Sequence, residues 1–178
     1  MDPITHTCSG ILIGQGLCPP PGVRRQTLLV SGLAAFAPDV DAVSYLWGSE
    51  AFYRFHHTYT HTVLGITALV ITLAGIERIW IKQIPLTRLL ALNLAGCTMH
   101  LLGDLIAIWP LRILWPWSDH DFTLHWTRDS DWVVLTVVVL ATGLAETDGF
   151  QKQVRWIIVG AFLILAAYFW WFPGWAGL

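Results

Sequence analysis

Three histidines fall within the six residues HHTYTH, at positions 56 to 61, directly before a long apolar run. Neutral imidazole is the side chain that most often binds metals in proteins, and aspartate oxygen is a second common ligand. Other residues of these two types lie beside or within apolar runs: His6, Asp39, Asp41, His100 and Asp104. The residue types therefore indicate a site for a divalent metal in an otherwise apolar chain.

The spacing of His100 and Asp104 places both on one helical face, because they are four residues apart. An ionisable residue inside an apolar run is costly in a membrane and is by default a functional candidate. His57 and His61 have the same spacing if their helix begins early. Alone, each group has a simpler interpretation: a hydrogen-bonded pair on the helix, interfacial histidines, or a solvated turn after Pro38.

Taken together, the candidate metal ligands number seven: His6, Asp39, Asp41, His56, His61, His100 and Asp104. A set of nitrogen and oxygen donors without thiolate favours zinc, manganese or iron, and we expect zinc first. Seven donors exceed the four of a structural zinc site, so two ions bridged by a carboxylate fit the count better. Two ions about 3.5–4 Å apart could activate water and hold both oxygens of a phosphoester displacement.

The proton-transfer residues that we expect beside such ions are Asp41 and His57. A carboxylate such as Asp41 could act as a general base, and His57 could protonate the leaving group. His120 and His125, in a later loop, are alternatives for the second role.

The elements that carry these residues are predicted to be membrane helices. The chain has 178 residues, of which 55% are hydrophobic and only 12% are charged, against about 25% charged in a soluble domain. The net charge of −2 gives no indication of a nucleic-acid partner. We expect one integral-membrane helical domain over residues 1–178.

Four segments approach the roughly 20 apolar residues that cross a bilayer as a helix: 62–81, 88–109, 131–147 and 154–172. Two shorter apolar runs precede them, 9–18 and 26–37, and Pro38 is expected to end the second. The predicted fold class is an all-α membrane protein with four long transmembrane helices and two shorter N-terminal helices.

Basic residues orient these helices. They concentrate in three links that alternate along the chain: Arg24, Arg25, Arg78, Lys82, Arg88, Lys152 and Arg155. Cytoplasmic links carry an excess of Lys and Arg, so we expect these three on the cytoplasmic side. Every histidine and every candidate aspartate then falls at the opposite, non-cytoplasmic face.

Five short stretches resemble the membrane-bound, metal-dependent hydrolase family, also described as LexA-binding, inner-membrane-associated hydrolases. They are MDPITH, APDVDAVS, HHTYTHT, the helix HLLGD and the following LWPWS. The resemblance implies a bacterial or archaeal membrane protein in which His56 and His61 are site histidines. His57 stands where this family often has Arg, so a cation that faces phosphate is replaced by imidazole. The helical metal site also looks like that of zinc-dependent phospholipase C.

The function that we expect is hydrolysis of a phosphoester, with a membrane phospholipid or isoprenoid phosphate as substrate, because the site lies at head-group depth. The alternative is a metal-ion or proton transporter, or a binding protein, that uses the same cluster. Transport would require ionisable groups that continue toward the basic links. Haem ligation between helices is a third possibility, but it would use two histidines and leave the carboxylates unexplained.

Overall fold

The computed structural model describes residues 1–172, and this range is helical, with no strand beyond one isolated bridge between Leu111 and Phe122. Its elements are α1 (Pro3–Gly16), α2 (Pro21–Phe36), the 3₁₀ helix η1 (Ala37–Trp47), α3 (Ser49–Phe55), α4 (Val63–Trp80), α5 (Leu86–Ile106), α6 (Trp132–Glu146), the 3₁₀ helix η2 (Gln151–Gln153) and α7 (Val154–Trp171).

Four of these segments are long and apolar enough to cross a membrane, so the predicted all-helical membrane fold is confirmed. They are Pro21–Trp47, Val63–Trp80, Leu86–Ile106 and Gln151–Trp171. The assignment of lengths differs in two places from the prediction. The run at 26–37 belongs to a continuous segment of 27 residues, whereas the run at 131–147 forms a helix of only 15 residues.

Proline explains the first difference. Pro38 occupies the first turn of η1, where its missing N–H leaves no hydrogen bond broken, so the chain continues as a 3₁₀ helix to Trp47. The first helix also begins earlier than residue 9. Asp2 accepts hydrogen bonds from the backbone N–H groups of Ile4 and Thr5, and Pro3 takes the favoured first helical position. His6 therefore lies on a capped helix.

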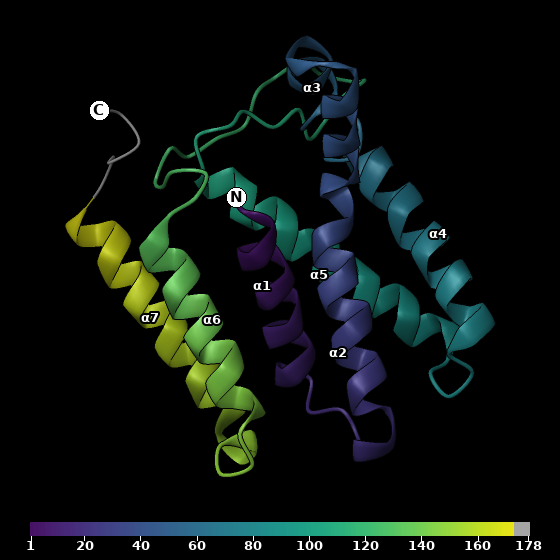
Figure 1. The fold of residues 1–178 in the computed structure, drawn as a ribbon, viewed down its shortest axis with the longest axis vertical. Helices are drawn as coiled ribbons and strands as arrows, with labels where there is room; N and C mark the ends of the chain where they lie inside the picture. The colour runs from purple at the N-terminus through teal and green to yellow at the C-terminus, as the bar shows by residue number, and fades with distance from the viewer. Residues whose placement is uncertain (173–178) are drawn as a thin grey trace.

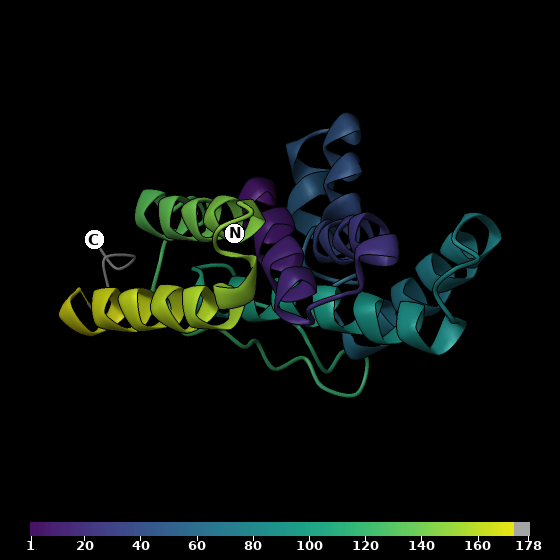
Figure 2. The same ribbon diagram turned by 90° about the horizontal axis from the view of Figure 1, so that it is seen from below.

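The helices pack around α1 and α2 at the centre (Figure 1). α1 packs against α2, α5 and α6, while α4 packs against α5. α6 and α7 form a pair on one side of α1, and α4 lies on the opposite side of the molecule (Figure 2). Glycines allow the close central contacts, since a Cβ at Gly10 or Gly96 would meet the Ser31 carbonyl oxygen at 2.3 Å or 2.8 Å.

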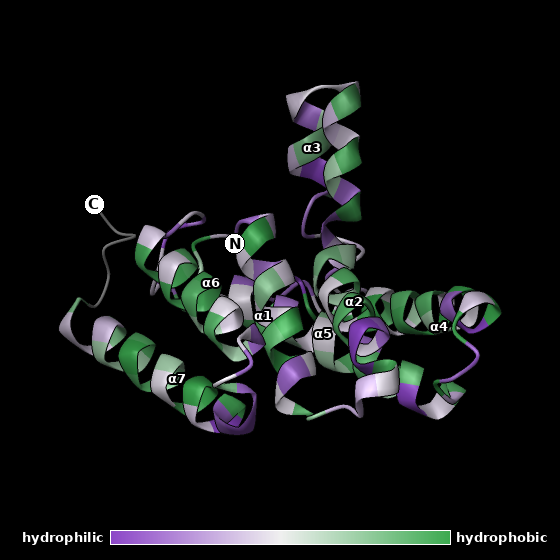
Figure 3. Cartoon of the chain, turned by 60° about the horizontal axis from the view of Figure 1, so that its bottom comes forward, coloured by the Kyte–Doolittle hydropathy of each residue, from purple (hydrophilic) through white to green (hydrophobic). Residues whose placement is uncertain are grey.

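The two ends of this bundle differ in chemistry. At one end the start of α2 contacts the end of α6, since Arg24 Nη2 lies 2.9 Å from Glu146 Oε2. At the other end lie the amino terminus of α1, η1, α3, the start of α4 and the end of α5. The sides of the long helices between these ends are largely hydrophobic (Figure 3). The histidines and aspartates of interest gather at the second end.

Candidate metal centre

The structure brings all seven predicted ligands into overlapping groups at this end. Each group could hold an ion, because its ligand atoms lie within 4.8 Å of one another. The groups are His6–Asp39–His100, Asp39–His57–His61, His61–His100–Asp104 and Asp39–Asp41–His56. They come from α1, η1, the link before α4 and α5. That these residues bind metal remains a prediction.

The centre of the cluster is formed by two imidazoles and two carboxylates. His61 Nε2 and His100 Nε2 lie 3.0 Å apart. Asp104 Oδ2 lies 3.0 Å from His100 Nε2 and 3.4 Å from His61 Nε2. Asp39 Oδ1 completes the group at 3.5 Å and 3.8 Å from the same two nitrogens. Asp104 and Asp39 therefore approach the same two imidazole nitrogens.

Both central histidines are held by their other ring nitrogen. His100 Nδ1 donates to the backbone carbonyl oxygen of Ala35 at 2.6 Å, and His61 Nδ1 lies 3.3 Å from Asp41 Oδ2. Thr60 Oγ1 lies 3.0 Å from His61 Nδ1 and donates to the same Asp41 oxygen. Carbonyl or carboxylate partners of this kind orient metal-binding histidines and fix their tautomer, so Nε2 is free to bind a metal.

Asp104 provides the test of whether a cation fits here. Its Oδ2 atom is buried and makes no hydrogen bond of good geometry, although His100 Nε2 and His61 Nε2 lie 3.0 Å and 3.4 Å away. The whole side chain is inaccessible to solvent, and a buried carboxylate oxygen that is poorly satisfied is unfavourable. A divalent ion between Asp104 Oδ2 and the two Nε2 atoms would satisfy it, so the donor set fits a metal.

The raised pKa of His61 also indicates that the surrounding carboxylates favour a positive charge at this position. Burial alone would lower the pKa of His61, but hydrogen bonds with Asp104, Asp39 and Asp41 outweigh it and raise the pKa to about 10. The three carboxylates therefore stabilise a cation at this position.

Asp41 and His56 form a second part of the cluster, next to Asp39. Asp41 Oδ1 lies 2.6 Å from His56 Nδ1, and Asp41 Oδ2 accepts from the backbone N–H of His57. Asp41 thus contacts the His56 ring through one carboxylate oxygen and the His57 backbone through the other. The sequence had suggested Asp41 as ligand and general base; its hydrogen bonds also give it a positioning role for His56 and His61.

His57 adopts a left-handed backbone conformation, with φ of 64°. Only a few per cent of non-glycine residues do so, and such conformations concentrate at functional sites. Its Nε2 lies 3.9 Å from Asp104 Oδ2. Burial, followed by the charge of His61, lowers the pKa of His57 to about 3, so its ring is neutral at pH 7. A neutral ring can act as a ligand through a free ring nitrogen, and the proton-donor role that the sequence predicts for His57 stays a prediction.

His6, on α1, contacts the other carboxylate oxygen of Asp104. Its Nε2 lies 3.0 Å from Asp104 Oδ1, and its ring stacks on that of His100 with centroids 3.7 Å apart. The amino group of Met1 also donates to Asp104 Oδ1. The amino group was not among the predicted residues, since no side-chain pattern indicates it.

Two of the histidines considered from the sequence lie outside the cluster. His120 packs against Phe122 with ring centroids 4.7 Å apart, and His125 is exposed in the loop after α5. Neither belongs to a group of metal-binding geometry among residues 1–172. They do not approach the centre as alternatives to His57.

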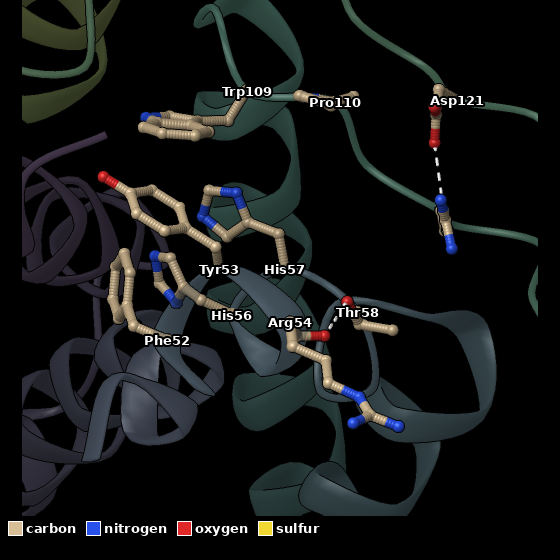
Figure 4. A pocket seen from close by; sticks show the side chains of 10 residues that line it. Phe52, Tyr53, Arg54, His56, His57, Thr58, Trp109, Pro110 and Asp121 are labelled. Atoms are coloured by element: carbon tan, nitrogen blue, oxygen red, sulfur yellow. Dashed lines mark hydrogen bonds and ion pairs between the residues drawn. The ribbon is translucent and has the colours of Figure 1, made fainter. Parts of the chain in front are cut away.

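A polar cavity of about 370 Å³ opens beside His57. In Figure 4 the His57 ring lies beside Tyr53 and below Trp109. The cavity is also lined by Arg54 and Arg112, two cations that the sequence analysis did not single out for the site. Arg112 Nε lies 3.3 Å from Asp121 Oδ1, and both side chains are about half exposed. The cavity therefore joins His57 to a solvent-accessible surface that carries Arg54, Arg112 and Asp121.

A second cavity, of about 900 Å³, lies on the His6 side and is lined mainly by apolar side chains from α1, α5, α6 and α7. His6 lines this cavity and His57 lines the polar one. Asp104 contacts both histidines. The cluster therefore stands between a polar and an apolar cavity.

Comparison with known proteins gives one family and one curated relative. The family model described as YdjM inner membrane protein matches residues 1–176. The inner membrane protein YbcI of Escherichia coli (strain K12) is 26% identical over 179 residues, which cover 94% of this chain and 96% of that protein. No solved structure matches the chain.

Proposed function

Because this chain belongs to the YdjM inner membrane protein family, and its polar residues gather at one end of the helices, we propose that it is a membrane-embedded, metal-dependent hydrolase. Its substrate is a phosphoester of a lipid or other amphiphile at the membrane surface. The observation that carries the proposal is the buried Asp104 Oδ2, which lies 3.4 Å and 3.0 Å from the imidazole Nε2 atoms of His61 and His100 without a hydrogen bond of good geometry.

Four side chains hold the first ion in this proposal: Asp39, His61, His100 and Asp104. The group Asp39–Asp41–His56 offers a place for a second, and zinc suits the nitrogen and oxygen donors before manganese or iron. When bound, a divalent ion supplies Lewis acidity toward a phosphoryl oxygen and lowers the pKa of water.

The chain's own residues bind and orient the substrate. Arg112, at the edge of the polar cavity, offers a planar pair of donors that suits a phosphate group. It supplies the cation that an arginine at position 57 would otherwise provide. A carboxylate oxygen of Asp41 accepts the proton that the attacking water loses, and His57 lines the cavity beside it.

The transporter alternative would need ionisable groups that continue from the cluster toward the basic links. In the described part of α2 and α5, the buried polar residues in that direction are Thr27, Ser31 and Asn93, which do not ionise. Asn93 Nδ2 donates to Glu77 Oε2 at 2.6 Å, so this one carboxylate already has a partner. The arrangement favours a site open at one end over a pathway.

The test is metal analysis of the purified protein combined with phosphoester assays on phospholipid and isoprenoid phosphate. We expect one or two zinc equivalents, and metal-dependent turnover that Asp41→Asn reduces by roughly 100-fold, since partners that orient metal ligands contribute 10–100-fold. Asp119→Asn, in the exposed loop at the same end, is the matched control and should retain full rate. Absence of turnover by the metal-loaded wild type on every phosphoester would reject the hydrolase and favour transport.

The orientation is part of the proposal: the cluster faces away from the cytoplasm. Ser49 begins α3 at the cluster end, and Gln151 lies in the exposed basic link at the other end. In a variant lacking Cys18, which is also exposed, we expect Ser49→Cys to react with an impermeant maleimide in intact cells and Gln151→Cys to react only after lysis. The reverse pattern would place the cluster in the cytoplasm.

A further inference from the structure

The apolar cavity next to His6 is enclosed by side chains from four helices. α1 forms one wall, and the other walls come from α5 on one side and from α6 and α7 on the other. The apolar lining includes Met99, Leu102, Val134, Val138, Phe162 and Leu165. Its volume of about 900 Å³ is in the range of sites that bind small molecules.

Three polar side chains from the start of α1, those of Thr5, His6 and Ser9, are among the lining residues. His6 Nε2 lies 3.0 Å from Asp104 Oδ1. The polar part of the lining therefore adjoins the candidate metal centre.

The cavity is also open to the side. Leu102 on α5 is 49% exposed, Phe162 on α7 is 69% exposed, and Trp170 near the end of α7 is 84% exposed. α5 and α7 are both long enough to cross the membrane. An opening between membrane-crossing helices faces lipid, so a molecule already in the bilayer can enter it without passing through water.

We propose that this cavity binds one acyl chain of the phospholipid whose phosphoester meets the His/Asp cluster. The inference rests on the proposed function and adds to it the class of substrate. Phospholipid acyl chains are the apolar groups that surround the helices, and the cavity extends to His6, which contacts the cluster through Asp104.

The acyl chain serves to position the phosphoester. A chain that moves from the bilayer into the cavity leaves no water, so it gains little hydrophobic free energy. On α7 the lining residues extend from Phe162 to Phe169, which are seven positions and roughly 10 Å apart along the helix axis. An acyl chain can lie against the helix over that length. Holding a reacting bond in place in this way accelerates the reaction, and a displacement of about 1 Å can cost 100-fold in rate.

Two adjacent alanines on α7 give a matched test. Ala166 lines the cavity and Ala167 does not, and both are exposed, so each tolerates a larger side chain. Ala166→Phe should lower kcat/KM at least about tenfold on a dioleoyl phospholipid and leave the rate on its dihexanoyl counterpart unchanged. Ala167→Phe should match the wild type on both substrates. An equal loss on both chain lengths, or no loss for Ala166→Phe, would overturn the acyl-chain site.

A binding measurement separates this inference from the hydrolase proposal. A phospholipid with a photoreactive diazirine in its acyl chain should label α5 and α7 around Leu102 and Leu165 in the wild type, and Ala166→Phe should lose this labelling. That result would support the acyl site even if no phosphoester were hydrolysed. Labelling that Ala166→Phe leaves unchanged, displacement by a polyisoprenyl phosphate in preference to phospholipid, or cross-links between two copies of the chain would each refute it.

Discussion

The two cavities that meet at the His/Asp cluster differ in both lining and origin. The cavity beside His57 is lined by charged, aromatic and imidazole side chains, mostly from α3 and the two loops that flank it in space. The cavity beside His6 is lined by aliphatic and aromatic side chains from four helices. One is suited to a phosphate and the other to hydrocarbon, and Asp104 touches a histidine of each.

In the proposed function, this difference lets the helix bundle offer a polar and an apolar site on two sides of the His/Asp cluster. Polar loops can supply cations only at the end of the bundle, where water is available. Apolar helices can supply a hydrocarbon site only along their lipid-facing length. The cluster lies where these regions meet, and the comparison predicts that damage to each region affects a different property.

The largest effect is expected from the residue that both regions share. Asp104→Ala removes the carboxylate that lies next to His61 and His100 and that is the partner of His6. Loss of a direct ligand should weaken metal affinity by more than the 10–100-fold typical of residues that only orient ligands. Metal analysis after dialysis should find the variant empty, while circular dichroism shows unchanged helix content.

Asp129→Ala is the control for the loss of an aspartate near the same group. Asp129 Oδ1 lies 3.4 Å from the Met1 amino group, but it is about half exposed and belongs to no metal-binding group among residues 1–172. It should keep full metal occupancy. Retention of metal by Asp104→Ala would show that the cluster is a hydrogen-bonded polar core.

A smaller effect, confined to substrate, should follow from a change in the polar cavity. Arg112→Ala removes a cation from the cavity lining and leaves the cluster intact. A hydrogen bond to a charged group contributes about 1.5–3 kcal/mol, so KM for a phosphoester should rise roughly 10- to 100-fold with unchanged metal content. Steady-state kinetics over a range of salt concentrations measures this.

Arg128→Ala removes an exposed cation from the same loop that does not line the cavity. Its KM should equal that of the wild type. If both arginine variants raise KM equally, the effect is one of general surface charge and Arg112 has no specific place in substrate binding.

Much of the cluster could be predicted because its residues violate the local pattern. Asp104 within an apolar helix and three histidines in six residues both stand out against a chain with 12% charged residues. Their gathering at one end followed from the alternation of basic links. The exact hydrogen bonds, such as that from His100 Nδ1 to the Ala35 carbonyl oxygen, depend on tertiary packing that no spacing reveals.

The cavities could not be predicted in the same way. Residues that line the apolar cavity, such as Leu102 and Leu165, look in sequence like any other lipid-facing or core residue. Arg54 and Arg112 are separated by more than 50 positions and by two long helices, and basic residues were interpreted only as topology signals. Helix lengths were misjudged at Pro38 because a 3₁₀ continuation accepts proline in its first turn.

The smallest effect, and the finest test of the comparison, concerns the glycine at which α5 passes His6. A Cβ at Gly103 would lie 3.1 Å from His6 Cε1 and 3.3 Å from His6 Nδ1. The ring has little room to yield, because it stacks on His100. Gly103→Ala should therefore displace His6 by a few tenths of an ångström and weaken metal binding by about 1 kcal/mol, roughly fivefold.

Gly75→Ala on α4 is the control. A Cβ there meets no atom within 4 Å, so the change should leave metal affinity unchanged and stabilise the helix by about 0.5–1 kcal/mol. Metal titration and thermal unfolding of both variants in the same detergent separate the two effects. Equal metal affinity in the two variants would mean that His6 lines the apolar cavity without binding the ion.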